Sequence, residues 1–233
     1  MIKILKWDTK FFNFNVAQIV TRNLDSFSFK RKLKFIKKKN IKLIKFNCFF
    51  CDRASIKTVQ QNNFKFVDLR IQYKKTIKTF NNNTGFFLSK SNNKEIPLLK
   101  KKFANNFHLT RYYFDKNFKK KKILNFYENW IERSVKGKFD DFTLVMKNNK
   151  TIIGFCTITI SSNSEAIIGL ISVVKNNKQF GVTLIKLLEN YLYKMNFKKL
   201  YVVTQGRNHR AQRLYDKCFF QINKIECYYH LWM

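Results

Sequence analysis

A short apolar run that leads directly into an amphipathic helix near the end of the chain constrains the fold most. Residues 200–204 are apolar and rich in β-branched side chains, which predicts a buried strand. Gly206 interrupts this run, and Asn208 is a favourable N-cap for the helix that follows. Apolar side chains then recur at helical spacing on one face: Ala211, Leu214, Tyr215 and Cys218. Because ligands of open α/β sheets bind at the carboxyl ends of strands, we expect a binding site at this junction.

The composition fits a folded α/β protein. Hydrophobic residues make up 45% and aromatic residues 17% of the 233 residues, which excludes a disordered polymer. There is no apolar run of about 18 residues and no N-terminal apolar segment of signal-peptide length, so we expect a cytoplasmic protein without membrane insertion. The odd number of cysteines argues against a disulfide framework. Cys48 and Cys51 are interpreted as core thiols at a strand end, and no metal site is expected.

The net charge of +33, from 47 Lys and Arg against 14 Asp and Glu, allows two interpretations. It can attract nucleic acid or anionic cofactors through a positive field. It can also reflect the composition of an AT-rich coding sequence, because Lys, Asn, Ile and Phe are abundant throughout the chain. We favour the second interpretation, so that nucleic acid would be bound only through non-specific charge.

Hydrophobic periodicity predicts a small α/β domain over residues 1–80 and a larger domain over 84–233, joined by an Asn-rich linker at 79–84. In the first domain we expect strands at 2–7, 16–20, 41–46 and 64–73 and helices at 29–39 and 54–61. In the second we expect strands at 86–89, 142–146, 152–160, 166–174 and 200–204, a last strand ending at Trp232, and helices at 95–105, 121–134, 182–195 and from Asn208.

Several sequence words spread over the chain carry a resemblance to a known family. They are 7–12 (WDTKFF), 110–115 (TRYYFD), 130–134 (WIERS) with Gly137, 203–205 (VTQ) and 229–232 (YHLW), besides the pattern of Asn208, Ala211, Leu214 and Tyr215. The chain resembles the GNAT N-acetyltransferases, and among them the bacterial acetyltransferases of nucleotide-linked amino sugars, such as those of the TDP-fucosamine type. The resemblance implies a GNAT fold, with a mixed, mostly antiparallel central sheet and flanking helices, after a small α/β domain.

The same resemblance implies the reaction. The acetyl group of acetyl-CoA would pass to the amino group of a nucleotide-activated amino-deoxy sugar of the TDP-4-amino-4,6-dideoxyhexose type, for surface polysaccharide or glycan synthesis. GNAT proteins place the acetyl-CoA pyrophosphate on a Q/R-x-x-G-x-G/A loop before a helix, where backbone N–H groups are unpaired. Here Gln179 replaces the first glycine. The implied cofactor-binding residues are Ile171, Ser172, Val173, Asn176, Asn177, Lys178, Gln179, Phe180, Gly181, Val182, Asn208 and Ala211.

Tyr215 is the implied catalytic acid, which would protonate the departing CoA thiolate. A phenol with a pKa of about 10 is a weak acid toward a thiolate whose pKa is about 8.5, so the site must reduce this difference. The family's Gly-Phe after this tyrosine is Phe219-Phe220 here. The resemblance also implies substrate binding by Arg111, Tyr112, Tyr113 and His230, against a competing interpretation of aromatic core and structural histidine. Glu165 and Asp68 are weak candidates for the general base.

Two alternatives remain open. The chain can be a catalytically degenerate, basic GNAT-like protein that binds RNA or the ribosome, as the altered glycine loop and the net charge suggest. It can also be a GNAT enzyme that acts on a protein amine. The sequence leaves open whether the protein is a homodimer.

Overall fold

The structure, a computed structural model, describes residues 1–21, 23–79, 85–175, 177 and 179–233. The chain forms two compact units that are not consecutive in sequence. The first comprises Met1–Ile71, Gln205–Arg207 and Lys224–Met233, and the second comprises Gln72–Thr204 and Asn208–Asn223. The last strand thus contributes residues to both units, a feature that the two-part division of the sequence does not include. The domains 1–80 and 84–233 stay a prediction.

The first unit is an α/β structure with its own core. Its elements are β1 (Ile2–Ile4), α1 (Lys6–Phe12), β2 (Asn15–Ile19), α2 (Ser26–Lys38), β3 (Ile41–Phe49), α3 (Arg53–Gln61) and parts of β4 (Lys65–Thr76) and β10 (Gln221–Trp232). The strand order is β1-β2-β3-β10-β4, with β2 and β3 parallel and β3 and β10 antiparallel. Both long helices begin at an aspartate, because Asp25 and Asp52 accept hydrogen bonds from the first turn of α2 and α3. The unit's buried side chains include Phe29, Ile36, Ile44, Phe46 and Val59.

The predicted strand at 2–7 is wrong in its second half. Strand β1 ends at Ile4, and Trp7 lies in the short helix α1, which the sequence analysis missed. Within α1, Trp7 and Phe11 are four residues apart, and their rings contact each other at 6.2 Å between centroids. The helix ends where Asn13 adopts a left-handed conformation with φ 62°. Aromatic side chains at helical spacing followed by an asparagine are therefore the signal that outweighed the β propensity of the preceding isoleucines.

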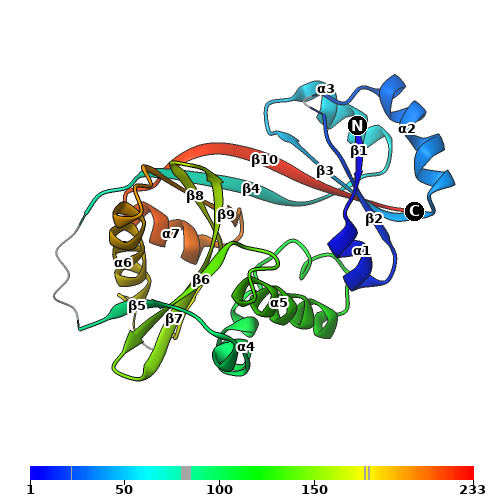
Figure 1. The fold of residues 1–233 in the computed structure, drawn as a ribbon. Coiled ribbons are helices and arrows are strands. Elements are labelled where there is room, and N and C mark those ends of the chain that lie inside the picture. The colour runs from blue at the N-terminus through cyan, green and yellow to red at the C-terminus, as the bar shows by residue number, and fades with distance from the viewer. Residues whose placement is uncertain (22, 80–84, 176, 178) are drawn as a thin grey trace. The chain divides into compact units, whose positions relative to one another are not determined.

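The second unit contains one mixed sheet with helices on both faces (Figure 1). Its strand order is β4-β9-β8-β7-β6-β5, and only β8 and β9 pair in parallel among the registers that run from β5 to β9. Its elements are β5 (Phe87–Lys90), η1 (Asn93–Glu95), α4 (Ile96–Phe103), η2 (Ala104–Asn106), α5 (Lys120–Val135), β6 (Phe142–Asn148), β7 (Thr151–Ser162), β8 (Glu165–Val173), α6 (Phe180–Lys194), β9 (Lys199–Gln205) and α7 (His209–Lys217). The predicted fold class, α/β with a mixed, mostly antiparallel sheet and flanking helices, is confirmed.

Two neighbouring residues of β7 show that the helices cover opposite faces of this sheet. A Cβ atom on Gly154 would lie 3.4 Å from Leu184 of α6. The ring of the next residue, Phe155, contacts Phe103 of α4 at 5.2 Å between centroids. Since successive strand residues point to opposite faces, α6 packs on one face and α4 on the other. Figure 1 shows the same arrangement, with α4 and α5 together on the side away from α6.

Candidate active site

Strands β8 and β9 separate within the sheet. Their parallel pairing runs from Glu165 opposite Lys199 to Ile168 opposite Val202, and both strands continue beyond that point. Residues 169–173 of β8 keep their pairing with β7 on the other side, as Val173 opposite Gly154 shows. Among the described residues, this segment of β8 forms no strand pairing with β9. One backbone edge at the carboxyl end of β8 is thus open to a ligand that can form strand-like hydrogen bonds.

The N-terminus of α6 follows this open edge in the chain. The helix has 15 residues, and its N-cap, Gln179, makes no side-chain capping hydrogen bond. The backbone N–H of Gln179 donates to Oδ1 of Asn177 at 2.8 Å, and both residues are exposed. The first turn carries no acidic side chain, which leaves the positive end of the helix dipole unneutralised. The predicted cofactor residues Asn176 and Lys178 lie outside the described residues.

Gly181 has a packing role in the helix pair α6 and α7. It is buried, and an added Cβ would lie 3.0 Å from Cδ1 and 3.1 Å from Cδ2 of Leu214. Only a glycine therefore lets α7 approach the first turn of α6 this closely without displacing the leucine. This contact accounts for the final glycine of the loop without any ligand, and cofactor binding by Gly181 and Val182 stays a prediction.

Asn208 is the N-cap of α7, as the sequence indicated. Its side-chain Oδ1 accepts a hydrogen bond from the backbone N–H of Ala211 at 3.2 Å. The cap starts α7 directly after β9, the strand that separates from β8. The structure therefore supports the capping interpretation, while contacts of Asn208 and Ala211 with a cofactor stay a prediction.

Tyr215 lies in the core of the second unit, with 2% of its surface exposed. Its ring contacts Tyr73 of β4 at 5.3 Å and Phe220 at 5.6 Å between centroids. Burial raises the pKa of its phenol above the ordinary value, and the nearby Tyr73 and Cys218 raise it further. The hydroxyl thus stays protonated at neutral pH. It can donate a proton but cannot serve as a base.

A buried ion pair lies close to this tyrosine, and the sequence analysis missed it. Nζ of Lys75 in β4 is 2.7 Å from Oε2 of Glu189 in α6, and the Glu189 side chain is fully buried. Burial raises the pKa of the Glu189 carboxyl, and the hydrogen bond from Lys75 opposes that shift. The Lys75 ammonium also lies 5.7 Å from the ring centroid of Phe220. A carboxylate directly after Leu187 and Leu188 on the apolar stripe of α6 was the signal that could have revealed this pair.

Two residues of the segment 130–134 bind a second buried carboxylate, that of Asp140. Nε1 of Trp130 donates to Asp140 at 2.9 Å, and the Ser134 hydroxyl donates to the same oxygen at 2.5 Å. The Thr159 hydroxyl donates to the other carboxylate oxygen at 2.8 Å. An added Cβ on Gly169 would lie 2.7 Å from that oxygen, so this glycine of β8 leaves room for the carboxylate. These hydrogen bonds to Asp140 therefore fix α5 to the sheet.

The structure gives different surroundings to the three neighbours Arg111, Tyr112 and Tyr113. Tyr112 is 2% exposed and packs between Phe118 and Phe126, as a core aromatic does. The Arg111 guanidinium stacks on the Tyr112 ring at 4.5 Å and donates to its hydroxyl at 3.0 Å. Tyr113 is only partly buried and lines a hollow. Substrate binding by these residues stays a prediction; Arg111 and Tyr113 are both partly exposed, and only Tyr113 lines the hollow.

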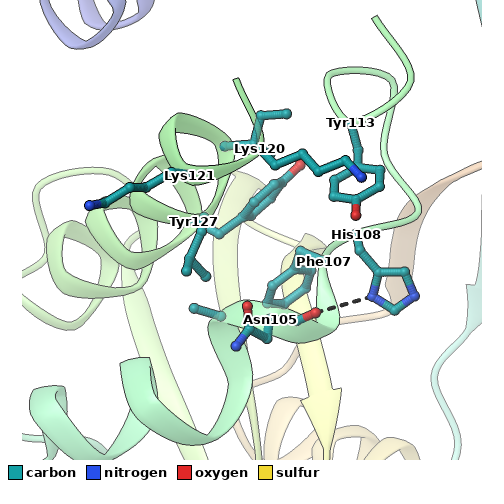
Figure 2. Close-up of a pocket in the computed structure, with 10 residues that line it drawn as sticks. Asn105, Phe107, His108, Tyr113, Lys120, Lys121 and Tyr127 are labelled. Carbon is teal, nitrogen blue, oxygen red and sulfur yellow. Dashed lines mark hydrogen bonds between the residues drawn. The ribbon is translucent and has the colours of Figure 1, made fainter. Parts of the chain in front are cut away.

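The hollow beside α5 has a volume of about 260 Å³ (Figure 2). Its lining comprises Ala104, Asn105, Phe107, His108, Tyr113, Lys120, Lys121, Ile123, Leu124 and Tyr127. The Phe107 ring stacks on Tyr127 at 5.0 Å, and the Lys120 ammonium lies 5.2 Å from the Tyr113 ring centroid. Nδ2 of Asn106 donates to the Ser172 hydroxyl at 2.8 Å, which ties this segment to the open edge of β8. Of these lining residues only Tyr113 was predicted from the sequence, because the other side chains come from separate turns of the chain.

The remaining candidates lie elsewhere. His230 belongs to β10 in the first unit, where it is buried opposite Lys45 of β3, whereas Tyr215 and β8 belong to the second unit. Asp68 pairs with Arg207 at 2.8 Å within the first unit, and burial is the main cause that raises the pKa of its carboxyl. Glu165 lies at the amino end of β8, the opposite end from the separation, which makes it a poor general base for chemistry there.

Among the described residues, no group of three or more His, Cys, Asp or Glu side chains is arranged to hold a metal ion. No helix of the described chain is long and apolar enough to cross a membrane. Cys48 is buried, as expected of a core thiol, but Cys51 is exposed.

Comparisons with known proteins agree with this geometry. The model of the Acetyltransferase (GNAT) family matches residues 104–220. A functionally unknown conserved protein from Staphylococcus epidermidis is similar in structure, with a TM-score of 0.65, 13% identity and coverage of 93% of this chain and 84% of that one. A GCN5-related N-acetyltransferase from Kribbella flavida gives a TM-score of 0.59, 6% identity and coverage of 93% and 80%. A tandem GNAT protein from the clavulanic acid biosynthesis pathway gives a TM-score of 0.57 at 9% identity, with coverage of 93% of this chain and 75% of that one. A search of curated proteins found no significant match in sequence.

Proposed function

We propose that this chain, which belongs to the GNAT family of acetyltransferases, transfers an acetyl group from acetyl-CoA to an amine at the opening between β8 and β9. The observation that carries this proposal is the end of the β8–β9 pairing at Ile168 and Val202, followed by an unpaired edge of β8. The amides of a pantetheine arm can form strand-like hydrogen bonds with such an edge. The uncapped N-terminus of α6 comes next in the chain and can bind the pyrophosphate.

Tyr215 is the proposed proton donor to the departing thiolate. Its phenol is buried and protonated. The residue lies in α7, the helix that follows β9 in the chain. Its raised pKa makes proton donation to water unfavourable, so donation requires a thiolate that is itself poorly solvated. The Tyr73 and Phe220 rings hold the phenol in place. The acceptor amine must arrive neutral, because none of Tyr215, Asp68 and Glu165 is placed to act as its base.

The proposed acceptor is the amino group of a nucleotide-linked amino-deoxy sugar. The sequence words at 7–12 and 110–115 support it, and the comparisons reach only the family. Tyr113 from the second word lines the hollow beside α5, which the Asn106–Ser172 hydrogen bond connects to β8. A product for surface polysaccharide or glycan synthesis follows from this choice of acceptor.

Calorimetry with acetyl-CoA tests the cofactor part. Gln179→Glu places a carboxylate at the N-cap of α6, where a negative charge is tolerated or stabilising, so the fold is preserved. One added charge about 6 Å from a phosphate of the pyrophosphate, at an effective dielectric constant of about 40, costs about 1.4 kcal/mol for each phosphate charge at that distance and weakens binding at least about tenfold. Gln221→Glu, an exposed position of β10 in the same unit, is the matched control and should bind like the wild type. Equal affinity of all three proteins would refute pyrophosphate binding at α6.

One observation favours a second candidate, binding of a polyanion by the first unit. Helix α2 contains no Asp or Glu and exposes a row of cations together with Phe27 and Phe35. The exposed cations are Lys30, Arg31, Lys34, Lys37 and Lys38. Such a surface suits the phosphates and bases of RNA.

Salt dependence tests this second candidate. Exchange of Lys30, Lys34 and Lys37 for Gln should lower the slope of log K against log salt for single-stranded RNA by about 2, at about 0.7 per phosphate contact. The control exchanges three exposed lysines of the second unit, Lys94, Lys116 and Lys150. Equal slopes for both triple variants would rule out α2 as the binding surface.

A further inference from the structure

We propose that the hollow beside α5 binds the nucleoside diphosphate part of the acceptor. This inference rests on the proposed function, because it assumes an acetyl acceptor linked to a nucleotide. It adds the location of the nucleotide and the residues that recognise it, Phe107, Tyr113 and Lys120, with the buried Tyr127 supporting the Phe107 ring from behind.

The walls of the hollow suit a planar ring. Phe107 and Tyr127 are stacked with their rings 5.0 Å apart and inclined by 19°, and Phe107 is only partly buried. Tyr113 presents a second partly exposed ring from the loop before α5. Leu124, which is partly exposed, adds apolar surface to the lining. Aromatic platforms of this kind bind bases by stacking and tolerate different bases.

The charges around the hollow suit an anion. Its lining includes Lys120, Lys121 and His108 and no carboxylate. The side chain of Lys120 extends to Tyr113, whereas that of Lys121 extends away from it (Figure 2). Lys120 therefore places an ammonium group beside a ring, as recognition of a base joined to a phosphate requires.

The start of α5 is electrostatically unusual in a way that a bound anion explains. Lysines occupy positions 120–122 of this 16-residue helix, its first turn has no acidic residue, and the N-cap Lys119 makes no side-chain capping bond. Cations at the positive end of a helix dipole are unfavourable, since that end favours anions. A diphosphate at the hollow would be attracted by both the lysines and the helix N-terminus.

The hollow is also joined to the proposed reaction site. The Asn106–Ser172 hydrogen bond, 2.8 Å long, fixes the segment before Phe107 to the edge of β8. All of these residues belong to the second unit. A nucleotide in the hollow would therefore be held by the same compact unit that carries the β8 edge and Tyr215, with its sugar extending toward the strand opening.

The test is calorimetric titration of the full chain with thymidine diphosphate in the presence of saturating CoA. We expect thymidine diphosphate to bind the CoA-loaded protein, and thymidine or pyrophosphate alone to bind at least tenfold more weakly. Lys120→Gln and Tyr113→Leu should each weaken thymidine diphosphate at least fivefold and leave acetyl-CoA affinity unchanged. Lys116→Gln, an exposed lysine of the same loop outside the lining, should change neither affinity.

Three results would overturn the inference. If CoA competes with thymidine diphosphate, the nucleotide binds at the cofactor loop instead of the hollow. If both variants bind it like the wild type, the hollow is not its site. If acetyl-CoA binds and thymidine diphosphate does not, the nucleotide inference fails while the acetyltransferase proposal stands, whereas failure of both ligands would refute the proposed function itself.

Discussion

Phe219, directly after the cap of α7, occupies a backbone conformation that favours glycine. Its φ is 60°, and the backbone N–H groups of Phe219 and Phe220 donate to the carbonyls of Asp216 and Tyr215. This is the Schellman pattern of helix ends, in which the residue at Phe219 is usually glycine. The ring contact between Phe220 and Tyr215 completes it. The turn that holds the proposed proton donor therefore forms despite the missing glycine, at a cost in backbone strain.

The cost can be worked out from two variants at this position. A side chain in the left-handed region costs about 1–2 kcal/mol, and glycine loses about 0.5–1 kcal/mol through its greater freedom in the unfolded chain. Phe219→Gly should therefore be more stable than Phe219→Ala by about 0.5–1 kcal/mol. The Phe219 side chain is 80% exposed, so both variants lose nearly the same small burial, and the comparison isolates the backbone term.

Urea unfolding, analysed where the transition is two-state, measures this difference. Lys217 is the last residue of α7 and is exposed, and its two variants supply the control pair. At that right-handed position Lys217→Gly should be less stable than Lys217→Ala by about 1 kcal/mol. If Phe219→Ala equals or exceeds Phe219→Gly in stability, the residue is not held in the left-handed conformation in solution, and the account of the turn behind Tyr215 is wrong.

Three other predictions follow from the second unit. Tyr215→Phe removes one hydroxyl from a packed ring, so we expect kcat to fall about 100-fold or more with unchanged acetyl-CoA affinity and melting temperature; an unchanged kcat would exclude Tyr215 as the acid. Gly181→Ala gains about 0.5–1 kcal/mol of helix propensity but places a methyl group 3.0 Å from Leu214, so we expect a net loss of about 1 kcal/mol in the free energy of unfolding, and a raised urea midpoint would contradict overpacking at this contact. Hydrogen bonds from Lys100 and Lys136 lower the pKa of Glu132 to about 2, so its stabilising effect should be present above about pH 4.3 and be lost as the pH falls toward 2. Glu132→Gln should thus lose about 1 kcal/mol at pH 7 and only a small part of this at pH 2, where the carboxyl is half protonated, and an equal loss at both values would rule out the ion pairs.

Local sequence signals predicted most of the second unit because they act within one element. The cap at Asn208, the apolar stripe of α7 and the β-branched run of β9 all appear in the structure at or near the expected positions. The hairpin between β6 and β7 turns at Asn149, whose φ of 50° is a conformation that asparagine tolerates.

The features that the sequence did not predict depend on residues that are far apart in the chain. The Lys75–Glu189 pair joins two elements separated by more than a hundred residues, and no local pattern marks its two members as partners. The hollow likewise combines η2 with the loop and first turns around α5. The last strand contributes residues to both units because of the strands with which it pairs, and the hydropathy pattern does not specify those partners. At Asn208 and Tyr215 a family motif coincides with a local geometry, a helix cap and a buried ring, while their roles toward a cofactor stay predictions.

Hydrogen exchange with and without acetyl-CoA tests the central claim most directly. The claim is that the cofactor binds along the β8 edge that β9 leaves open. Exchange of backbone amides should slow in peptides that cover residues 169–173 and 179–182 when acetyl-CoA is added, because the ligand pairs with or covers them. Peptides from β6, which pairs with a strand on each side, should not change. Acetyl-CoA binding without protection of residues 169–173 would contradict the claim and place the cofactor elsewhere on the protein.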